Sequence, residues 1–173
     1  QPLAIPPMVL RRGQERILLV DDELTLVEMG KRMLEDLGYR VEARTDSVEA
    51  MEVFRAQPDQ FELVITDYTM PHMTGLDLTR EVLAVRPDIP VILCTGFSES
   101  FTEEKVNAKG IRKLVMKPFT KQEIAWAVAE ALEDARGTKL KPGEAGIGDS
   151  RPGHEAPRPG IPSVAFIDPL QGE

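Results

Sequence analysis

Three acidic residues follow directly after a short apolar segment near the start of the chain. Residues 17–20 are Ile-Leu-Leu-Val, and Asp21, Asp22 and Glu23 come next. An apolar segment this short is typical of a buried strand, and three adjacent carboxylates repel one another. Two explanations are open. The acids could begin a helix, where negative charge suits the positive end of the helix dipole, or they could hold a divalent cation.

Three later apolar segments also end in residues that could do chemistry. Asp67 follows Leu-Val-Ile-Thr, Thr95 and Gly96 follow Val-Ile-Leu-Cys, and Lys117 and Pro118 follow Leu-Val-Met. Any one of them alone would be read as an ordinary loop residue. Together with the first acids they indicate more, because carboxylates from two strands form an oxygen-rich site that suits Mg²⁺. A carboxylate can also act as a nucleophile and form an acyl phosphate, beside which a lysine supplies a compact positive charge.

The segments that carry these residues alternate between strand-like and helix-like patterns. Short apolar or alternating segments predict strands at residues 16–20, 39–44, 61–66, 90–95 and 111–116, and amphipathic patterns predict helices at residues 26–37, 46–57, 76–86, 98–110 and 120–135. This alternation indicates an α/β fold with a parallel sheet and helices on both faces. In such sheets ligands bind beyond the carboxyl ends of the strands. We therefore expect the acids, Thr95 and Lys117 to converge at that edge.

Helix boundaries carry their own signals in three places. Asp46 with Glu49, and Thr120 with Glu123, have the spacing of a capping box at a helix start. Gly38 follows the first helical pattern, as expected for a residue that ends a helix.

Length, charge and cysteine content limit the possible functions. The chain has 173 residues, which is one ordinary domain with extensions: residues 1–15 as an N-terminal linker, 16–136 as the domain, and 137–173 as a Pro/Gly-rich tail. A net charge of −8 argues against nucleic-acid binding. No apolar run approaches the roughly 20 residues of a membrane span, so we expect no membrane contact. The single cysteine, Cys94, fits a reducing cytoplasm. Because the chain starts at Gln1, we expect it to be part of a longer polypeptide.

The segments LLVDDE, LVITDYTMPHMTGLDL, VILCTG and VMKPF occur in the order and with the spacing of a known family. Over residues 16–136 the chain resembles the receiver domain of two-component response regulators, the CheY-like domains. The resemblance implies a flavodoxin-like, doubly wound sheet of five parallel strands in the order 2-1-3-4-5 with five helices. It also implies a cis peptide bond before Pro118.

The resemblance implies a role for each residue at the strand ends. Asp67 would be the phosphoacceptor, Thr95 would hydrogen-bond a phosphoryl oxygen, and Lys117 would pair with the phosphoryl group. The cofactor would be Mg²⁺, and its protein ligands would come from four positions: Asp22 directly, Asp21 through water, Asp67, and the backbone carbonyl of Thr69.

The implied function is phosphoryl transfer from phosphohistidine to Asp67 in a two-component phosphorelay. The partner would be a histidine kinase or a histidine phosphotransfer domain. The segments 67–78 and 92–99 look most like receivers at the C-terminal end of hybrid sensor histidine kinases. Homo-oligomerisation is left open. Two alternatives remain: a binding module that has the receiver fold without phosphotransfer, and a phosphatase with an aspartyl nucleophile, which would want an acid where Thr69 stands.

The chain departs from the family pattern at Leu114, where most members carry Tyr or Phe. An aromatic switch driven by phosphorylation is therefore in doubt. Thr69 and Phe97 occupy positions that tune the lifetime of the phosphoryl group in the family, and no rate follows from them.

Five further residues have side chains that could take part in function. We interpret His72 as a solvated loop residue, His154 as an isolated residue of the tail, and Cys94 as a small core residue. Leu24 is either packed on a neighbouring loop or available to the phosphodonor. Trp126 points away from the apolar stripe of its helix, so it is either a lone exposed aromatic or a contact for a partner or for the apolar segment at residues 163–170.

Overall fold

The fold is a single parallel sheet of five strands. The structure is a computed structural model and describes residues 13–96, 107 and 109–137. The strands lie in the order β2-β1-β3-β4-β5, and every neighbouring pair is parallel. This is the predicted order. The strands are β1 (Arg16–Val20), β2 (Arg40–Arg44), β3 (Leu63–Asp67), β4 (Val91–Thr95) and β5 (Lys113–Met116).

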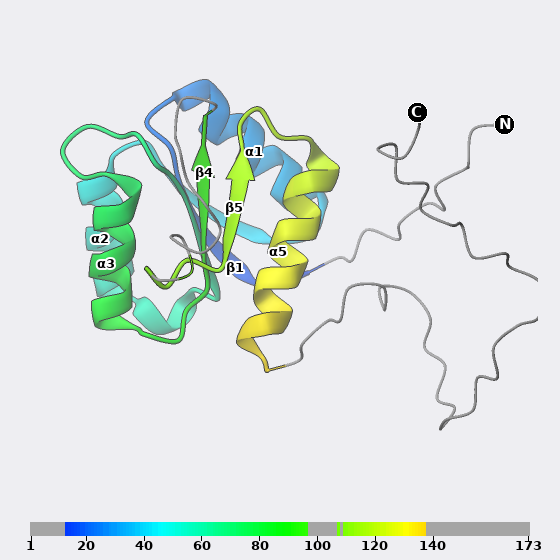
Figure 1. Cartoon of the computed structure of the whole chain (residues 1–173). Coiled ribbons are helices and arrows are strands. Elements are labelled where there is room, and N and C mark those ends of the chain that lie inside the picture. The colour runs from blue at the N-terminus through cyan, green and yellow to red at the C-terminus, as the bar shows by residue number, and fades with distance from the viewer. Residues whose placement is uncertain (1–12, 97–106, 108, 138–173) are drawn as a thin grey trace, which may run out of the picture. The chain divides into compact units, whose positions relative to one another are not determined.

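Helices cover both faces of the sheet. Figure 1 shows α2 and α3 on one side of the strands, with α1 and α5 on the other. Most of the helix predicted at residues 98–110 lies outside the described residues, so the described part of the chain has four of the five predicted α-helices. They are α1 (Leu24–Asp36), α2 (Ser47–Ala56), α3 (Gly75–Val85) and α5 (Lys121–Ala135), with a short 3₁₀ helix, η1 (Pro58–Gln60), after α2. Among the described residues, none of these helices is long and apolar enough to span a membrane.

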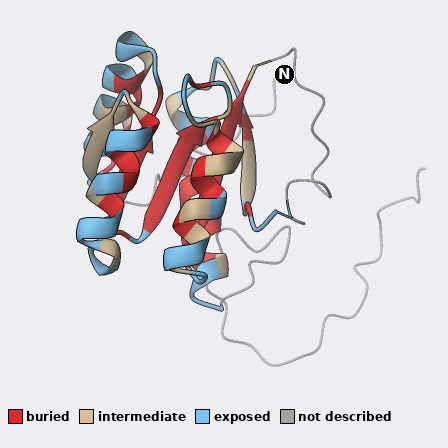
Figure 2. Cartoon of the chain, turned by 90° about the vertical axis from the view of Figure 1, so that its left-hand side faces the viewer, coloured by how far each residue is buried: buried red, intermediate tan, exposed pale blue. Residues whose placement is uncertain are grey.

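Each face of the sheet carries its own core. Because side chains alternate along a strand, Ile17 and Leu19 of β1 pack with α1 and α5, whereas Leu18 and Val20 pack with α2 and α3. The strands β3 and β4 are buried over their whole length. Figure 2 shows this pattern as buried strands flanked by helices whose outer surfaces are exposed. Strands buried on both faces explain why their sequences read as continuous apolar runs.

The helix boundaries bear out most of the expected signals. Thr120 and Glu123 form the predicted capping box at the start of α5. At α2 only half of the predicted box forms: the Asp46 side chain accepts hydrogen bonds from the backbone N–H groups of Val48 and Glu49. Gly38 follows α1 with a φ of 96°, a left-handed conformation that favours glycine.

The first helix answers part of the question raised by the acids after β1. Helix α1 begins at Leu24, and its N-cap residue, Glu23, makes no capping hydrogen bond through its side chain. Asp21 and Asp22 precede that cap, so they lie at the end of β1 and outside the first turn of the helix. Capping of α1 therefore does not account for these two acids.

Candidate functional site

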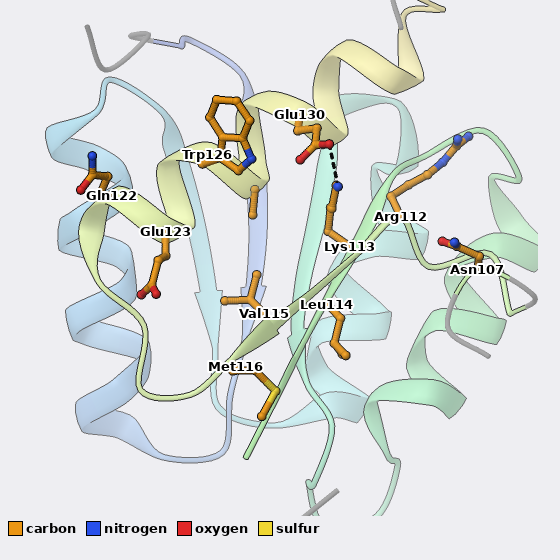
Figure 3. A pocket seen from close by; sticks show the side chains of 11 residues that line it. Asn107, Arg112, Lys113, Leu114, Val115, Met116, Gln122, Glu123, Trp126 and Glu130 are labelled. Carbon is orange, nitrogen blue, oxygen red and sulfur yellow. Dashed lines mark ion pairs between the residues drawn. The ribbon is translucent and has the colours of Figure 1, made fainter. Parts of the chain in front are cut away.

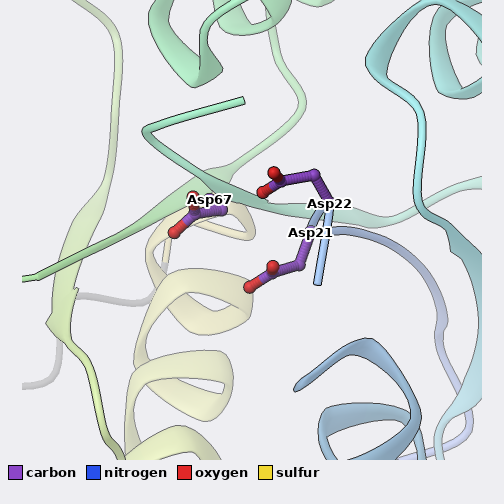
Figure 4. A group of neighbouring side chains, drawn as sticks. All are labelled: Asp21, Asp22 and Asp67. Carbon is purple, nitrogen blue, oxygen red and sulfur yellow. The ribbon is translucent and has the colours of Figure 1, made fainter. Parts of the chain in front are cut away.

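Three carboxylates meet at the carboxyl ends of the strands. Asp21 and Asp22 follow β1, and Asp67 is the last residue of β3, the strand beside it. One carboxylate oxygen from each lies within 4.8 Å of the others. Figure 4 shows the three side chains near one another, with their carboxylates projecting to the same side. Asp21 and Asp67 are buried and Asp22 is exposed, so the cluster opens to solvent on the Asp22 side.

A lysine from the opposite part of the sheet joins two of these acids. Lys117 follows β5, and its Nζ atom donates to Asp21 Oδ2 and to Asp67 Oδ1, each at 2.9 Å. We call Asp21, Asp22, Asp67 and Lys117 the carboxylate site. Within the described residues, the ion pairs of Lys117 are with Asp21 and Asp67 and not with Asp22. The sequence predicted Lys117 at this edge of the sheet but not its contacts with Asp21 and Asp67. A single predicted cation among three predicted carboxylates was the signal that could have indicated these ion pairs.

Burial and ion pairing have opposite effects on the pKa of Asp67, and the same is true of the pKa of Lys117. Burial raises the pKa of Asp67 above its ordinary value, although the Lys117 ammonium opposes that rise. Burial by itself lowers the pKa of Lys117, but hydrogen bonds to Asp21 and Asp67 outweigh it, so the lysine pKa is raised. Lys117 is therefore charged at neutral pH, and it offsets part of the cost of holding two carboxylates out of water.

Backbone N–H groups fix the orientation of the two buried acids. The N–H of Thr69 donates to Asp67 Oδ2 at 3.0 Å, and the N–H of Glu23 donates to Asp21 Oδ1 at 2.9 Å. Each buried carboxylate thus has one oxygen on Lys117 and the other on a backbone amide. The carboxylates are held in place before any ligand arrives.

Gly75 is the first residue of α3, where the loop after Asp67 leads into the helix. In the structure the loop closes through a 2.8 Å hydrogen bond from the Gly75 N–H to the carbonyl of Tyr68. A Cβ atom at Gly75 would lie 2.1 Å from the backbone oxygen of Asp67. The backbone of α3 approaches the end of β3 so closely that only glycine fits.

Thr95 and Lys117 are joined through the backbone at the ends of β4 and β5. The N–H of Lys117 donates to the Thr95 carbonyl at 2.7 Å. The Thr95 hydroxyl is buried and donates to the carbonyl of Gly96 at 3.3 Å, so its side chain makes no hydrogen bond to the carboxylates in this structure. The peptide bond between Lys117 and Pro118 is cis, as the family resemblance implied.

The remaining singled-out residues take simple positions. His72 is exposed, as expected, and has a φ of 69°. Cys94 is buried, as predicted for a core residue, and burial raises the pKa of its thiol to about 12. Leu24 is 60% exposed at the start of α1, which argues against packing on a neighbouring loop. Phe97 and His154 lie outside the described residues.

A second feature lies beside the free edge of the sheet. A cavity of about 560 Å³ runs along β5 and α5; we call it the β5–α5 groove. Figure 3 shows Leu114, Met116 and Trp126 around it, and the ion pair between Lys113 and Glu130 at one side. Met116 and Trp126 are exposed, as predicted for Trp126, while Leu114 packs against Leu93 and Ile111.

Comparison with known proteins places the whole domain in one family. A family model of the response regulator receiver domain matches residues 17–129. Chemotaxis protein CheY of Pseudomonas aeruginosa is 33% identical over 131 residues, which cover 70% of this chain and 99% of that protein. The crystal structure of a response regulator receiver domain protein from Clostridium thermocellum superposes with a TM-score of 0.68 at 29% identity, covering 72% of this chain and 99% of that one.

Other relatives are much longer than this chain. Sensor kinase CckA of Brucella abortus is 33% identical over 121 residues, which cover 70% of this chain but only 13% of that kinase. Sensor protein EvgS of Escherichia coli is 32% identical over 120 residues, or 9% of its length. The family match, the fold and the arrangement of strand ends agree: this chain belongs to the response regulator receiver domains of two-component systems.

Proposed function

We propose that this receiver domain takes a phosphoryl group from a phosphohistidine onto Asp67 with the help of Mg²⁺. The observation that carries the proposal is the contact of one lysine with two of three clustered carboxylates, Asp67 among them. We further propose residues 16–136 as the functional unit, between an N-terminal linker (1–15) and a tail (137–173).

The donor set fits a hard divalent cation. Carboxylate oxygens from Asp21, Asp22 and Asp67 lie within 4.8 Å of one another, and oxygen is the ligand atom that Mg²⁺ prefers. In the proposal these three residues and the backbone carbonyl of Thr69 hold the ion. When bound, Mg²⁺ offsets the repulsion between the carboxylates and an incoming phosphoryl group.

The residues of the chain divide the remaining work. An oxygen of Asp67 forms a bond to phosphorus as the bond between phosphorus and the donor imidazole nitrogen breaks, and the imidazole leaves and takes up a proton. Thr69 N–H and Lys117 hold the carboxylate in position. Lys117 neutralises negative charge on the phosphoryl oxygens. Thr95, whose hydroxyl donates to the neighbouring Gly96 carbonyl, turns to donate to a phosphoryl oxygen.

The proposed donor is a histidine kinase or a histidine phosphotransfer domain. Sensor kinases among the relatives support a setting in which this receiver works with a kinase, as part of the same chain or beside it.

The test is to incubate the whole chain with Mg²⁺ and acetyl phosphate and to measure its intact mass. The expected result is one labile phosphoryl group, absent when EDTA replaces Mg²⁺. A chain that stays unmodified would support a receiver-fold binding module instead. Steady hydrolysis of unrelated phosphoesters would support a phosphatase.

A further inference from the structure

We infer that Ser47, a buried serine at the start of α2, is a positioning residue that sets the affinity of the carboxylate site for Mg²⁺. Its hydroxyl holds the loop between β3 and α3, which carries Thr69. The inference rests on the proposed function, because the backbone carbonyl of Thr69 is one of the groups proposed to hold the ion. Ser47 acts through Pro71 of that loop and is not itself a ligand.

The hydroxyl of Ser47 makes a contact between two segments that are distant in the chain. Ser47 is the first residue of α2 and is 2% exposed. Its Oγ atom donates to the carbonyl oxygen of Pro71, 24 residues later, at 3.3 Å. The start of α2 does not need this hydroxyl, because the N-cap is Asp46, whose side chain already accepts from backbone N–H groups of the first turn. A buried hydroxyl is costly without a partner, so the Pro71 carbonyl is what allows a serine at this position.

The carbonyl of Pro71 also closes a strained turn. It accepts a second hydrogen bond from the N–H of Met73 at 2.8 Å, and His72 between them has a φ of 69°. A hydrogen bond that spans a single residue with positive φ defines a γ-turn of the rare, strained kind. Glycine adopts such a φ freely, whereas histidine does so at a cost in energy. A strained turn keeps its shape only where surrounding contacts hold it, and the Ser47 hydroxyl is one of those contacts.

The turn is close in the chain to the groups of the metal site. Only Met70 separates Pro71 from Thr69. The N–H of Thr69 donates to Asp67 Oδ2 at 3.0 Å, so a shift of the turn would move both the Thr69 carbonyl and one hydrogen bond of the proposed acceptor. Met70 is buried in the same core cluster as Met51 of α2. Helix α2 thus holds the loop at two adjacent residues, by packing at Met70 and by the hydrogen bond to Pro71.

Two other buried hydroxyls lie near this loop, and their hydrogen bonds are local. The Thr66 hydroxyl donates to the carbonyl of Asp67, the next residue, at 3.0 Å. The Thr79 hydroxyl donates to the Gly75 carbonyl at 2.7 Å, four residues back within α3. Both threonines are as buried as Ser47. Of these three hydroxyls, that of Ser47 is the one that ties the loop to a separate helix, so its loss should allow the loop to shift.

The experiment compares the whole wild-type chain with Ser47→Ala. Mg²⁺ binding is measured by isothermal titration calorimetry without a phosphodonor, and the fold is checked by circular dichroism and urea titration. Removing a group bonded directly to a metal ligand weakens metal binding by roughly 10–100-fold; Ser47 acts from further away, so we expect binding about fivefold weaker.

Phosphorylation by acetyl phosphate gives a second measurement of the same effect. The Mg²⁺ concentration that gives the half-maximal rate should rise about fivefold in Ser47→Ala, while the rate at saturating Mg²⁺ stays close to that of the wild type. A Ser47→Ala chain that folds and binds Mg²⁺ as tightly as the wild type would overturn the inference.

A matched control removes a buried hydroxyl whose hydrogen bond stays inside one helix. Thr79→Val does this, because Thr79 is as buried as Ser47 and bonds within α3. It should lower the stability of the fold and leave the affinity for Mg²⁺ unchanged. Equal losses of affinity in Thr79→Val and Ser47→Ala would overturn the inference, because they would reduce the effect to a general loss of stability.

A double-mutant cycle with His72→Gly tests whether Ser47 acts by holding the γ-turn. Glycine adopts a φ of 69° without strain, so the turn then depends less on the hydroxyl. The loss of Mg²⁺ affinity caused by Ser47→Ala should be smaller in the His72→Gly background than in the wild-type chain. An undiminished loss would overturn the inference, because Ser47 would not act through this turn.

In case Ser47→Ala does not fold, the wild-type chain gives an independent measurement. If the turn sets the metal affinity, the metal must in return hold the turn, because coupling between two sites is reciprocal. Adding Mg²⁺ should slow hydrogen exchange of the Met73 N–H, which bonds to the Pro71 carbonyl, and leave exchange of the Gly38 N–H after α1 unchanged. A Met73 N–H whose exchange does not respond to Mg²⁺ would overturn the inference.

The inference and the proposed function fail in different ways. A wild type that forms the phosphoryl adduct, with a Ser47→Ala variant that binds Mg²⁺ equally well, overturns the positioning role alone. A wild type that binds Mg²⁺ but forms no adduct, with a Ser47→Ala variant that binds the ion about fivefold more weakly, overturns the phosphotransfer alone. Absence of Mg²⁺ binding in the wild type overturns both.

Discussion

The carboxylate site and the β5–α5 groove meet at the end of β5, where Lys117 follows the strand, and the two regions are built in opposite ways. At the carboxylate site, Asp21 and Asp67 are buried, paired with Lys117 and held by backbone amides. In the groove, apolar side chains are left exposed, with Trp126 42% and Met116 41% accessible. The groove residue Met116 directly precedes Lys117 in the chain. Chemistry is thus organised in advance at one end of β5, while the surface beside it has the character of a contact region.

The carboxylate site and the groove differ in composition, and little coupling is expected between them. Leu114 of β5 lines the groove and stands at the position where the resembled family usually carries an aromatic ring. It packs against Leu93 and Ile111 and has no polar group that could follow a change at Thr95. The two regions should therefore respond separately to substitution and to phosphorylation.

The largest expected effect is complete loss of phosphorylation in Asp67→Asn. The amide cannot act as the nucleophile, while its size and its contact with the Thr69 N–H are largely kept. The measurement is intact mass after acetyl phosphate treatment, with circular dichroism to check the fold. Asp59→Asn is the control, because Asp59 is an exposed acid in η1. An Asp67→Asn chain that still gains one labile phosphoryl group at the wild-type rate would show that the acceptor is misassigned.

Gly75→Ala should be the most destabilising substitution beside the carboxylate site. The new Cβ would lie 2.1 Å from the Asp67 carbonyl oxygen, so backbone must move. We expect a loss of about 2 kcal/mol or more in the free energy of unfolding, measured by urea titration. Gly96→Ala is a matched control at the end of β4, since a Cβ there has no atom of the described residues within 4 Å. Equal stability losses in the two variants would contradict the close-approach argument.

Asp22→Ala should remove metal binding and stabilise the metal-free protein. Lys117 compensates Asp21 and Asp67 but not Asp22, so Asp22 adds only repulsion when no metal is bound. The expected gain is about 1 kcal/mol, seen as a higher melting temperature in EDTA, together with loss of the Mg²⁺ signal in calorimetry. A lower melting temperature than that of the wild type would count against carboxylate crowding.

Much of the fold and of the carboxylate site could be predicted from the sequence, because the patterns that indicate them are local or repeated along the chain. Continuous apolar runs such as residues 63–66 and 91–94 predicted strands buried on both faces, and these strands are β3 and β4. Acids and a lysine at the ends of such strands had to meet at one edge once the sheet was parallel. The convergence of Asp21, Asp22, Asp67 and Lys117 was therefore predictable without knowing any distance.

What could not be predicted depends on contacts between distant segments. The two partners of Lys117 follow from the register of β1, β3, β4 and β5, which periodicity does not give. The close approach at Gly75 depends on how α3 packs onto the end of β3. At α2 the spacing of Asp46 and Glu49 was right for a capping box, but only the Asp46 side chain contributes.

A smaller effect should separate Asp67→Asn from the wild type as the pH changes. Burial raises the pKa of Asp67 above its ordinary value of 3.8, so the folded protein binds this proton more tightly than the unfolded chain does. The wild type is then most favoured by this group below pH 3.8 and loses that stability as the pH rises through the raised pKa. An asparagine at position 67 does not ionise, so it adds no such pH-dependent contribution to stability.

The asparagine variant should therefore melt a few degrees above the wild type at neutral pH. That difference should disappear as the pH falls toward 3.8. Thermal melts of both proteins across this range, without metal, provide the measurement. A melting difference that is independent of pH would mean that ionisation of Asp67 does not limit stability.

The smallest expected effect is the response of the β5–α5 groove to phosphorylation. Beryllofluoride mimics the bound phosphoryl group, and Lys117 and Thr95 should close on it because those contacts are local and charge-assisted. Leu114 can keep one packing against Leu93 and Ile111 in both states. Without a two-state element at that position, little coupling energy reaches the groove.

Amide chemical shifts with and without beryllofluoride test this separation of the two regions. Changes should concentrate in the loops after β1, β3 and β4 and at Lys117, while the amides of Leu114 and Trp126 change little. Leu114→Tyr is the informative partner variant, because a ring with a polar tip can take a second position when Thr95 moves, and should spread the changes into α5. Large changes along β5 and α5 in the wild type, with dimer formation in sedimentation velocity, would show that the groove is coupled to Asp67 by some route other than Leu114. A receiver whose changes stay local is better suited to passing the phosphoryl group on than to switching a distant surface.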